Sequence, residues 1–468
     1  MKKLVFLVVA LSMLFFATAK ADPKEYIMLR RSLEQAERPQ IRSPFRIFEE
    51  VTVAGNIEQK LDHNSKSDLR TFKQRYWRNS SYARGVDAPV LLFVCGEGAC
   101  GEYAVGGQTA IHAQKLGAHV FALEHRYYGH SQPFADLQTH NLKYLTTEFA
   151  LKDLVAFQSQ MQKELGLSGK WITIGGSYPG SLSAYARALY PHQFAGALAS
   201  SAPVMADLDF SEYDEHIARM AGQKCLSAIM STVSQIESEI VTDEGFVAVK
   251  AEFNASVLRD RDDFLYLLAD SAAAAVQYGL RTKFCSYLEQ SGRAGYVTGV
   301  QLISNYFGNL VDMSAQAAED ISLAKNSTGV GMRQWFYQSC TEYGYWQNAS
   351  SDSSLRSRSA RINASYHERL CERLFGIKTP APVEQTNNNF YLPLLDTQTS
   401  KIYFTNGSED PWMNLSITEL NGNLTNPALQ SLVIPGAAHC DDLGSKSTPA
   451  IVRAKDEFYN LSLEWLSL

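Results

Sequence analysis

The chain has 468 residues, of which 45% are hydrophobic and 20% are charged, and its formal net charge is −6. This composition is that of a globular protein, and the length is sufficient for more than one packed unit. The sequence carries no surplus of basic residues that would bind a phosphate backbone, so we expect no nucleic acid among its partners.

The N-terminus has the pattern of a secretory signal peptide. Lys2 and Lys3 precede a mostly apolar run at 4–16, and Ala19 and Ala21 are small residues at the two positions that a signal peptidase reads. The apolar run is shorter than the roughly 20 residues that span a bilayer. We therefore predict a signal peptide over 1–21 rather than a membrane anchor. We expect a mature chain without a membrane span, either secreted or delivered to the lysosomal or endosomal lumen.

Cysteines and glycosylation sequons agree with export. The seven cysteines would tend to pair in an oxidising compartment, and their odd number leaves at least one without an intramolecular partner. No pair has the C-x-x-C spacing of a zinc or redox site, and we expect neither a metal nor another cofactor. Candidate glycosylation sequons occur at Asn79, Asn254, Asn326, Asn348, Asn363, Asn406, Asn414, Asn423 and Asn460.

Short apolar runs alternate with helical patterns in the first part of the chain. Predicted strands cover 89–94, 119–123, 171–174 and 195–200. Predicted helices cover 107–116, 147–165 and 178–190. Strands interleaved with helices indicate a parallel sheet that is covered on both faces.

The middle of the chain has few strand patterns and many helical ones, such as 210–230 and 263–287. Strand patterns return at 401–405 and 429–434, and a last helix begins at Pro449. The sheet is therefore expected to be built from both ends of the chain. The predicted division is a signal peptide at 1–21, a first core part at 22–205, a helical cap insertion at 206–390 and a second core part at 391–468.

The stretch 172–180 (ITIGGSYPG) carries the most specific chemical signal. An apolar strand runs through two glycines to Ser177, and a helix follows. This is the setting of a nucleophile elbow, in which a serine on a sharp turn needs small neighbours and strained backbone angles. The turn would expose the hydroxyl at the carboxyl end of the sheet and aim the Tyr178 N–H at a developing oxyanion. The alternative is a tight turn with a buried serine.

One position departs from the G-x-S-x-G pattern, because Pro179 occupies the place of the last glycine and Gly180 follows it. A proline is tolerated early in a helix, where its missing N–H has no helical partner. Proline also pushes the preceding residue away from the α region. Pro179 therefore restricts the backbone conformation of Tyr178, whose N–H we assign to the oxyanion hole.

The acid and the base are expected to follow the serine in the order Ser, acid, His. Asp410 lies in a turn directly after the predicted strand 401–405, with Glu409 beside it as the runner-up acid. His439 lies in a loop of small residues after the strand 429–434. Because all three fall in loops after predicted strands, we predict that His439 takes the proton of Ser177 and that Asp410 orients the imidazole.

The glycine loop after the first predicted strand supplies further candidates. Backbone N–H groups of Gly96, Glu97 or Gly98 are expected to join Tyr178 in the oxyanion hole. The Glu97 side chain has two interpretations, as a group that binds a substrate amine or as a structural acid paired within the loop. The run 439–442 (HCDD) is not interpreted as a metal site, because adjacent residues do not converge on one ion without a second pair of ligands.

Several motifs together resemble the family of lysosomal prolyl carboxypeptidase, dipeptidyl peptidase II and thymus-specific serine protease. The segment 199–213 and the run YQSCTEYG around Cys340 are most similar to the thymus-specific branch, as is the cysteine after His439. The matching segments are 59–63 (QKLDH), 72–77 (FKQRYW), 96–98 (GEG), 124–129 (EHRYYG), 175–180 (GGSYPG), 200–203 (SSAP), 340–342 (CTE), 406–412 and 436–440.

This resemblance implies an α/β-hydrolase core with a mostly parallel sheet and an inserted helical cap. It carries the triad onto Ser177, Asp410 and His439. It implies cleavage next to proline near a peptide terminus, and a homodimer is a further expectation. It also implies two disulfides in the cap. These pairs are Cys340–Cys371 and Cys225–Cys285, while any pairing among Cys95, Cys100 and Cys440 stays open.

The main hypothesis is therefore a serine exopeptidase that acts on short peptides, with the cap restricting entry. The sequence leaves open whether cleavage occurs at the amino or the carboxyl end. A serine esterase or lipase on the same core is the first alternative, and a non-catalytic binding protein is the second. Glu124, His125 and Arg126 are expected to form a supporting polar network rather than to act in catalysis.

Overall fold

The computed structural model describes residues 52–467, so the predicted signal peptide lies outside the described residues. Eight strands form one sheet in the order β1-β2-β4-β3-β5-β6-β7-β8. The two pairings of β2, with β1 and with β4, are antiparallel, and all other pairings are parallel. The strands are β1 (Thr52–Lys60), β2 (Thr71–Asn79), β3 (Val90–Val94), β4 (His119–Leu123), β5 (Trp171–Gly176), β6 (Phe194–Ser200), β7 (Ile402–Gly407) and β8 (Gln430–Ile434).

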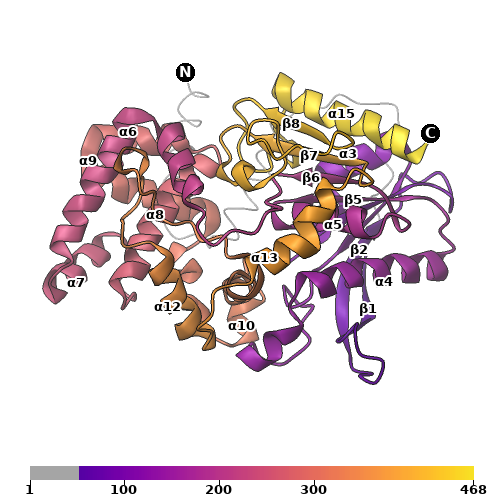
Figure 1. Ribbon diagram of the computed structural model, residues 1–468, viewed down its shortest axis with the longest axis horizontal. Coiled ribbons are helices and arrows are strands. Elements are labelled where there is room, and N and C mark those ends of the chain that lie inside the picture. The colour runs from indigo at the N-terminus through magenta and orange to yellow at the C-terminus, as the bar shows by residue number, and fades with distance from the viewer. Residues whose placement is uncertain (1–51, 468) are drawn as a thin grey trace, which may run out of the picture. The chain divides into compact units, whose positions relative to one another are not determined.

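Helices cover both faces of this sheet, as the sequence predicts for parallel strands (Figure 1). Successive side chains of a strand point to opposite faces. In β3, Leu91 packs in the apolar cluster of α3 (Gly107–Leu116) and α15 (Pro449–Leu466). Its neighbour Leu92 packs in the cluster of α4 (Thr147–Leu165) and α5 (Tyr178–Leu189). The molecule therefore has the α/β-hydrolase core that we expected.

Helices dominate the chain between β6 and β7, and they build an apolar cluster of their own. Figure 1 shows α6, α8 and α9 gathered to one side of the strands. How this part divides from the core into domains stays a prediction. The helices are α6 (Ser211–Glu239), α7 (Asp243–Glu252), α8 (Arg261–Gln277), α9 (Arg281–Phe307), α10 (Leu323–Asn326), α11 (Met332–Gln338), α12 (Ala364–Phe375), α13 (Val383–Thr386) and α14 (Leu392–Leu395).

The stretch 263–287 is helical, as predicted, but it is divided between two helices. α8 ends at Gln277 and α9 begins at Arg281. Gly279 lies between them with φ +72°, a left-handed conformation that ends a helix and that glycine adopts without steric cost. The alanine-rich pattern of this stretch concealed the break.

Three disulfides hold the described chain. Cys225–Cys285 joins α6 to α9, and Cys340–Cys371 joins the turn after α11 to α12. Both pairs implied by the resemblance are therefore confirmed. Cys95–Cys100 closes the loop behind β3, which leaves Cys440 as the free thiol among residues 52–467.

Burial separates the candidate sequons into two groups. A glycan cannot be accommodated on a side chain that the fold covers, so four of the asparagines are removed as acceptors in the folded protein. Those four are Asn79, Asn326, Asn348 and Asn406. Exposed asparagines remain candidates, and they are Asn254, Asn363 and Asn460. Asn414 and Asn423 are half-buried, and each uses its side-chain amide to donate to a backbone carbonyl.

Across residues 52–467, none of the helices combines the length and the apolar character that crossing a bilayer requires.

Candidate active site

Ser177 lies on the turn between β5 and α5 in a strained conformation. Its φ of 62° and ψ of −137° are rare for a residue with a side chain, and such strain concentrates at functional sites. The Ser177 N–H donates to the Ser200 carbonyl at 2.8 Å, which ties the turn to β6. A Cβ on Gly175 would lie 2.1 Å from the Pro179 carbonyl oxygen. Only glycine therefore permits strand and helix to approach this closely.

Pro179 has a packing partner that explains its place in the elbow. A Cβ on Gly96 would lie 2.2 Å from Cγ of the Pro179 ring, so ring and glycine loop are in close contact. Pro179 occupies one of the first two positions of α5, where no N–H is needed. As the first residue of α5, Tyr178 has an N–H that no carbonyl of the helix can accept, which leaves it available to an oxyanion.

The phenol of Tyr178 is fixed by two hydrogen bonds. It donates to Nε2 of His125 at 3.0 Å and accepts from Nε2 of Gln338 at 2.9 Å. Nδ1 of His125 in turn donates to the Arg126 carbonyl at 2.7 Å. Burial lowers the pKa of His125 to about 4, so the ring is neutral and its Nε2 is an acceptor. These contacts hold Tyr178 in place although a proline follows it.

Asp410 and His439 form a buried pair. Nδ1 of His439 donates to Oδ2 of Asp410 at 2.9 Å, and the second carboxylate oxygen accepts from the Trp412 N–H at 3.1 Å. The Asp410 side chain is fully buried and that of His439 is 5% exposed. Burial alone would lower the pKa of His439, but the charge of Asp410 outweighs it and raises the pKa well above its usual value.

The neighbouring carboxylate, Glu409, has a different partner. Its Oε1 accepts from Nη2 of Arg281 at 2.7 Å, in a half-buried ion pair with the first residue of α9. The structure therefore assigns the histidine to Asp410 and not to the runner-up acid.

The loop that carries His439 lies against the elbow. The Cys440 N–H donates to Oγ of Ser201 at 2.9 Å, and a Cβ on Gly176 would lie 2.8 Å from Cys440 Sγ. The His439 ring packs edge-on against Tyr278, with 5.7 Å between the centroids. Tyr278 and Ser177 line the same cavity. The fold thus brings serine, histidine and aspartate from three distant segments to one edge of the sheet.

Two residues that sequence reasoning missed hold this loop. Asp442 is buried and accepts from Oγ of Ser200 at 2.5 Å and from Oγ1 of Thr405 at 2.7 Å, which binds the loop to β6 and β7. The backbone carbonyl of Gln277 accepts from the His439 N–H at 2.8 Å. The acidic pair after His439 was a signal for Asp442, whereas no local pattern marked Gln277.

The glycine loop after β3 (96–98) lies against the segment 329–331 of the inserted part of the chain. The Ala99 N–H donates to the Gly329 carbonyl at 3.0 Å, and the Gly331 N–H donates to the Glu97 carbonyl at 3.1 Å. Oε2 of Glu97 is shielded from solvent, and no hydrogen-bond donor reaches it within the described part of the chain. Burial raises the pKa of the Glu97 carboxyl. A hydrogen bond from the Glu97 backbone N–H opposes this rise, so both interpretations of the Glu97 side chain stay predictions.

A cavity of about 230 Å³ opens between the sheet edge and the inserted helices. Ser177 and Glu97 line it from the core, and Trp412 lines it from the turn after β7. α8 contributes a further wall, and so does the segment around Trp335. The cavity is large enough for a small part of a peptide and not for a folded protein.

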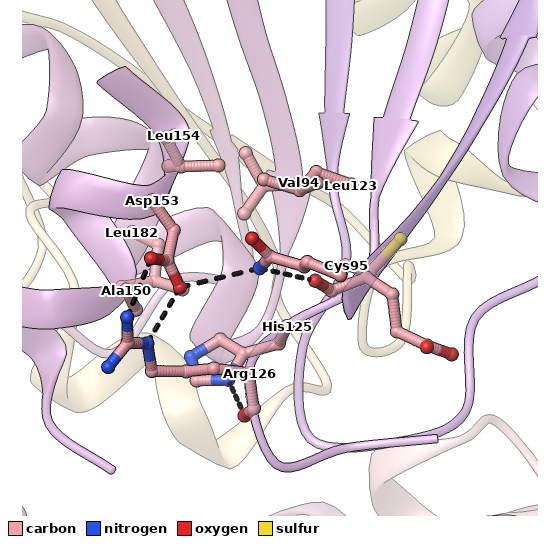
Figure 2. A pocket seen from close by; sticks show the side chains of 11 residues that line it. Val94, Cys95, Leu123, His125, Arg126, Ala150, Asp153, Leu154 and Leu182 are labelled. Carbon is pink, nitrogen blue, oxygen red and sulfur yellow. Dashed lines mark hydrogen bonds and ion pairs between the residues drawn. The ribbon is translucent and has the colours of Figure 1, made fainter. Parts of the chain in front are cut away.

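The expected supporting network lies behind the glycine loop, and Figure 2 shows Arg126 directed at Asp153 within it. The buried guanidinium of Arg126 donates twice to Asp153, each time at 2.7 Å, and three times to backbone carbonyls. Glu124 accepts from the Cys100 N–H and from Oγ of Ser131. These contacts connect the start of the described chain, α4 and the glycine loop, and none of them enters the large cavity.

The fold and the site together define a serine hydrolase of the α/β-hydrolase class. The model of the family described as serine carboxypeptidase S28 matches residues 59–456, and the chain belongs to this family of serine peptidases. The thymus-specific serine protease of Mus musculus is 32% identical over 462 residues, covering 89% of this chain and 88% of the mouse protein. The protein named "Probable serine protease EDA2" of Arabidopsis thaliana is 39% identical over 374 residues, covering 77% and 75%.

A more distant relative is named "Probable extracellular serine carboxypeptidase" in Arthroderma benhamiae; it is 26% identical, covering 82% of this chain and 63% of the fungal protein. Among solved structures, the proline iminopeptidase of Mycobacterium smegmatis matches with a TM-score of 0.37 and 12% identity, covering 84% of this chain and 95% of that one.

Proposed function

We propose that the protein is a serine exopeptidase that cleaves peptides through an acyl-enzyme formed on Ser177. The observation that carries the proposal is the buried Asp410–His439 pair, joined at 2.9 Å on loops next to a strained serine elbow. A histidine with one nitrogen held by a carboxylate presents the other nitrogen as a base.

The reaction follows from these positions. His439 Nε2 takes the hydroxyl proton while Ser177 Oγ bonds to the carbonyl carbon, and the carbonyl oxygen becomes an oxyanion. The N–H of Tyr178 and one or more N–H groups of Gly96, Glu97 and Gly98 stabilise this charge. The imidazolium then gives its proton to the amine nitrogen as the C–N bond breaks. A water molecule, deprotonated by His439, hydrolyses the ester and restores the serine.

Exopeptidase action is favoured by the small cavity beneath the inserted helices, which admits a chain end more readily than a loop of a folded protein. We further infer cleavage next to proline. Tyr278, Trp335 and Trp412 line the cavity with aromatic surface on which a pyrrolidine ring packs. The resemblance to prolyl peptidases supports the same preference. Secretion or lysosomal delivery is supported by three disulfides.

Replacing the nucleophile tests the mechanism. We expect Ser177→Ala to lower turnover of proline-containing peptides by about 10⁴-fold or more without changing the melting temperature. Ser159→Ala, on the exposed surface of α4, is the matched control and should retain activity. A fluorophosphonate probe should label the wild-type protein and the control but not Ser177→Ala.

The same panel separates the alternatives. Acyl esters cleaved while all peptides are left intact would indicate an esterase or lipase. A folded wild-type protein that neither labels nor turns over substrate would indicate a binding protein, and turnover retained in Ser177→Ala would end the assignment. Mass spectrometry of cleaved peptides identifies the end from which residues are removed.

A further inference from the structure

One face of α8 forms a wall of the cavity that contains Ser177. Its lining residues recur every three or four positions, the spacing of one helix face. They are Asp263, Tyr266, Leu267, Asp270, Ala274 and Gln277. This face therefore runs from the catalytic loops, where Gln277 meets His439, into the inserted helices.

The two carboxylates on this face differ in their surroundings. Asp263 is paired, because it accepts from Nη2 of Arg373 at 2.9 Å and from the Tyr366 hydroxyl at 3.0 Å. Asp270 has no hydrogen-bond donor and no cation within 4.0 Å among residues 52–467. Asp270 is half-buried, and burial raises its pKa to about 7 while the charge of Arg358 opposes this rise.

The cation whose charge acts on Asp270 is Arg358, and this side chain already has other partners. Arg358 lies 3.3 Å from Asp214, donates to the Gln347 carbonyl at 2.7 Å and stacks on the Tyr213 ring. Arg358 forms its ion pair with Asp214 and acts on Asp270 only at a longer distance. Glu97 adds a second carboxylate to the same cavity, and no donor reaches its Oε2 atom within residues 52–467.

The remaining walls are aromatic. Tyr266, Tyr278, Phe307, Trp335 and Trp412 line the cavity. Aromatic faces attract ammonium and guanidinium groups, and this attraction is stronger where water is excluded. A cavity with aromatic walls and a carboxylate that has no ion pair is suited to a cation and unsuited to an anion.

The helix gives the distance from the reacting bond. Asp270 precedes Gln277 by seven residues, which corresponds to about 10 Å along α8 at a rise of 1.5 Å per residue. Gln277 is the contact point of the His439 backbone. An extended peptide advances about 3.4 Å per residue, so 10 Å is about three residues. A long Lys or Arg side chain on a residue nearer the cleaved bond would reach the same point.

We propose that Asp270 is the centre of a cation subsite that binds an ammonium or guanidinium group of the substrate within about three residues of the cleaved bond. The cation is either a Lys or Arg side chain or the free amino terminus. The proposal rests on Ser177 being the reacting residue of this cavity, and it makes Asp270 a determinant of specificity.

Binding measured in the Ser177→Ala variant tests the subsite without turnover. Tripeptide amides that carry Lys, or its uncharged isostere norleucine, at each position are titrated by calorimetry, each with a free or an acetylated amino terminus. We expect the cationic peptide that reaches Asp270 to bind roughly 10- to 100-fold more tightly than its neutral isostere. A preference for Lys over norleucine that persists after acetylation identifies the side chain as the cation. A similar fall in affinity of the Lys and norleucine peptides on acetylation identifies the amino terminus.

Adding Asp270→Asn to the Ser177→Ala variant should make the cationic peptide and its neutral isostere bind with equal affinity. Asp262→Asn removes the same charge from α8 but affects a side chain that pairs with Arg361 and Arg369, and it should keep the ratio. Equal affinity for all cationic and neutral peptides, or a ratio that survives Asp270→Asn, would overturn the subsite. The peptide comparison on the intact cavity remains decisive if Asp270→Asn does not fold.

The outcome is independent of the proposed chemistry. Turnover by the wild-type protein tests Ser177, whereas the affinity ratio in Ser177→Ala tests Asp270. An active peptidase with no charge preference would reject the subsite alone. A charge preference without turnover by the wild-type protein would reject the proposed function while keeping a cation-binding cavity.

Discussion

Among the individual residues, Asp410 and Glu409 differ by one position in the chain and have unrelated surroundings. Asp410 is fully buried against His439, while Glu409 pairs with Arg281 from the inserted helices. A backbone turn sends consecutive side chains in different directions, so adjacency does not make the two acids equivalent. Their substitution should therefore have different consequences.

Asp410→Asn is expected to lower kcat by about 10⁴-fold, because an amide cannot stabilise the imidazolium and permits the wrong ring tautomer. Glu409→Gln is the matched control and should cost less than about tenfold, since its ion pair lies outside the triad. Steady-state kinetics on one peptide substrate checks both variants. Equal losses in the two, or a larger loss for Glu409→Gln, would contradict the assignment.

The pH dependence of activity follows from the raised pKa of His439. Only the neutral imidazole can take the Ser177 proton, so kcat/KM should fall as the pH drops through the pKa of the free enzyme. Because Asp410 holds this pKa above its ordinary value, the midpoint of the acidic limb should lie above pH 6.5. A profile of kcat/KM between pH 4 and 9 checks this, and a rate that stays flat down to pH 4 would rule out the base.

At the scale of the elements, the elbow depends on how closely β5 and α5 approach each other. A methyl group on Gly175 would meet backbone atoms of Pro179 and Gly180, which cannot move without displacing the start of α5. The same close approach explains why Pro179 is tolerated, because its ring fills the space beside Gly96.

Gly175→Ala is therefore expected to destabilise the fold by at least about 2 kcal/mol and to abolish activity. Gly106→Ala is the control, since a Cβ at Gly106 would meet only the Tyr103 carbonyl oxygen at 3.5 Å, an ordinary contact. Thermal unfolding followed by circular dichroism measures both. A Gly175→Ala protein with unchanged melting temperature and activity would show that the elbow is less tightly packed than described.

The buried parallel strands were predicted from the sequence, whereas the two antiparallel strands at the start of the described chain were not. The strands expected at 119–123 and 171–174 correspond to β4 and to most of β5. β1 and β2 were not predicted as strands although 59–63 and 72–77 stood out as motifs. β1 pairs with β2, and β2 pairs with β4 some 45 residues further along the chain, both antiparallel.

At the scale of the whole molecule, the inserted helices are held by a disulfide that closes a long loop. Cys225–Cys285 spans 60 residues and joins α6 to α9, the two helices on either side of α7 and α8. Closing a loop of this length restricts the unfolded chain by up to about 4 kcal/mol. Since α8 lines the cavity, the stability of this region and the shape of the site are linked.

Replacing both Cys225 and Cys285 by Ala should therefore lower the melting temperature and raise KM more than it lowers kcat, because the triad lies on the core. Cys440→Ala, which removes the free thiol, serves as the control for cysteine loss and should not lower the melting temperature. Thermal unfolding and kinetics on one peptide substrate check the pair. An unchanged melting temperature in the double variant would contradict a stabilising role.

The homodimer and the glycans at Asn254, Asn363 and Asn460 stay predictions of the sequence. Light scattering of the purified protein and mass spectrometry after deglycosylation check them.

The sequence by itself determined the fold class, the serine elbow and the order in which acid and histidine follow, because each depends on a strand pattern and the few residues after it. Tertiary structure decided between Asp410 and the runner-up Glu409 as the partner of His439, and it alone decided the Cys95–Cys100 bond and the exposure of Asp270 to the cavity. These depend on which side chains from distant segments meet, and on whether a buried charge finds a partner. Neither is written in the local pattern of residues, because the partners are brought together only when the chain packs.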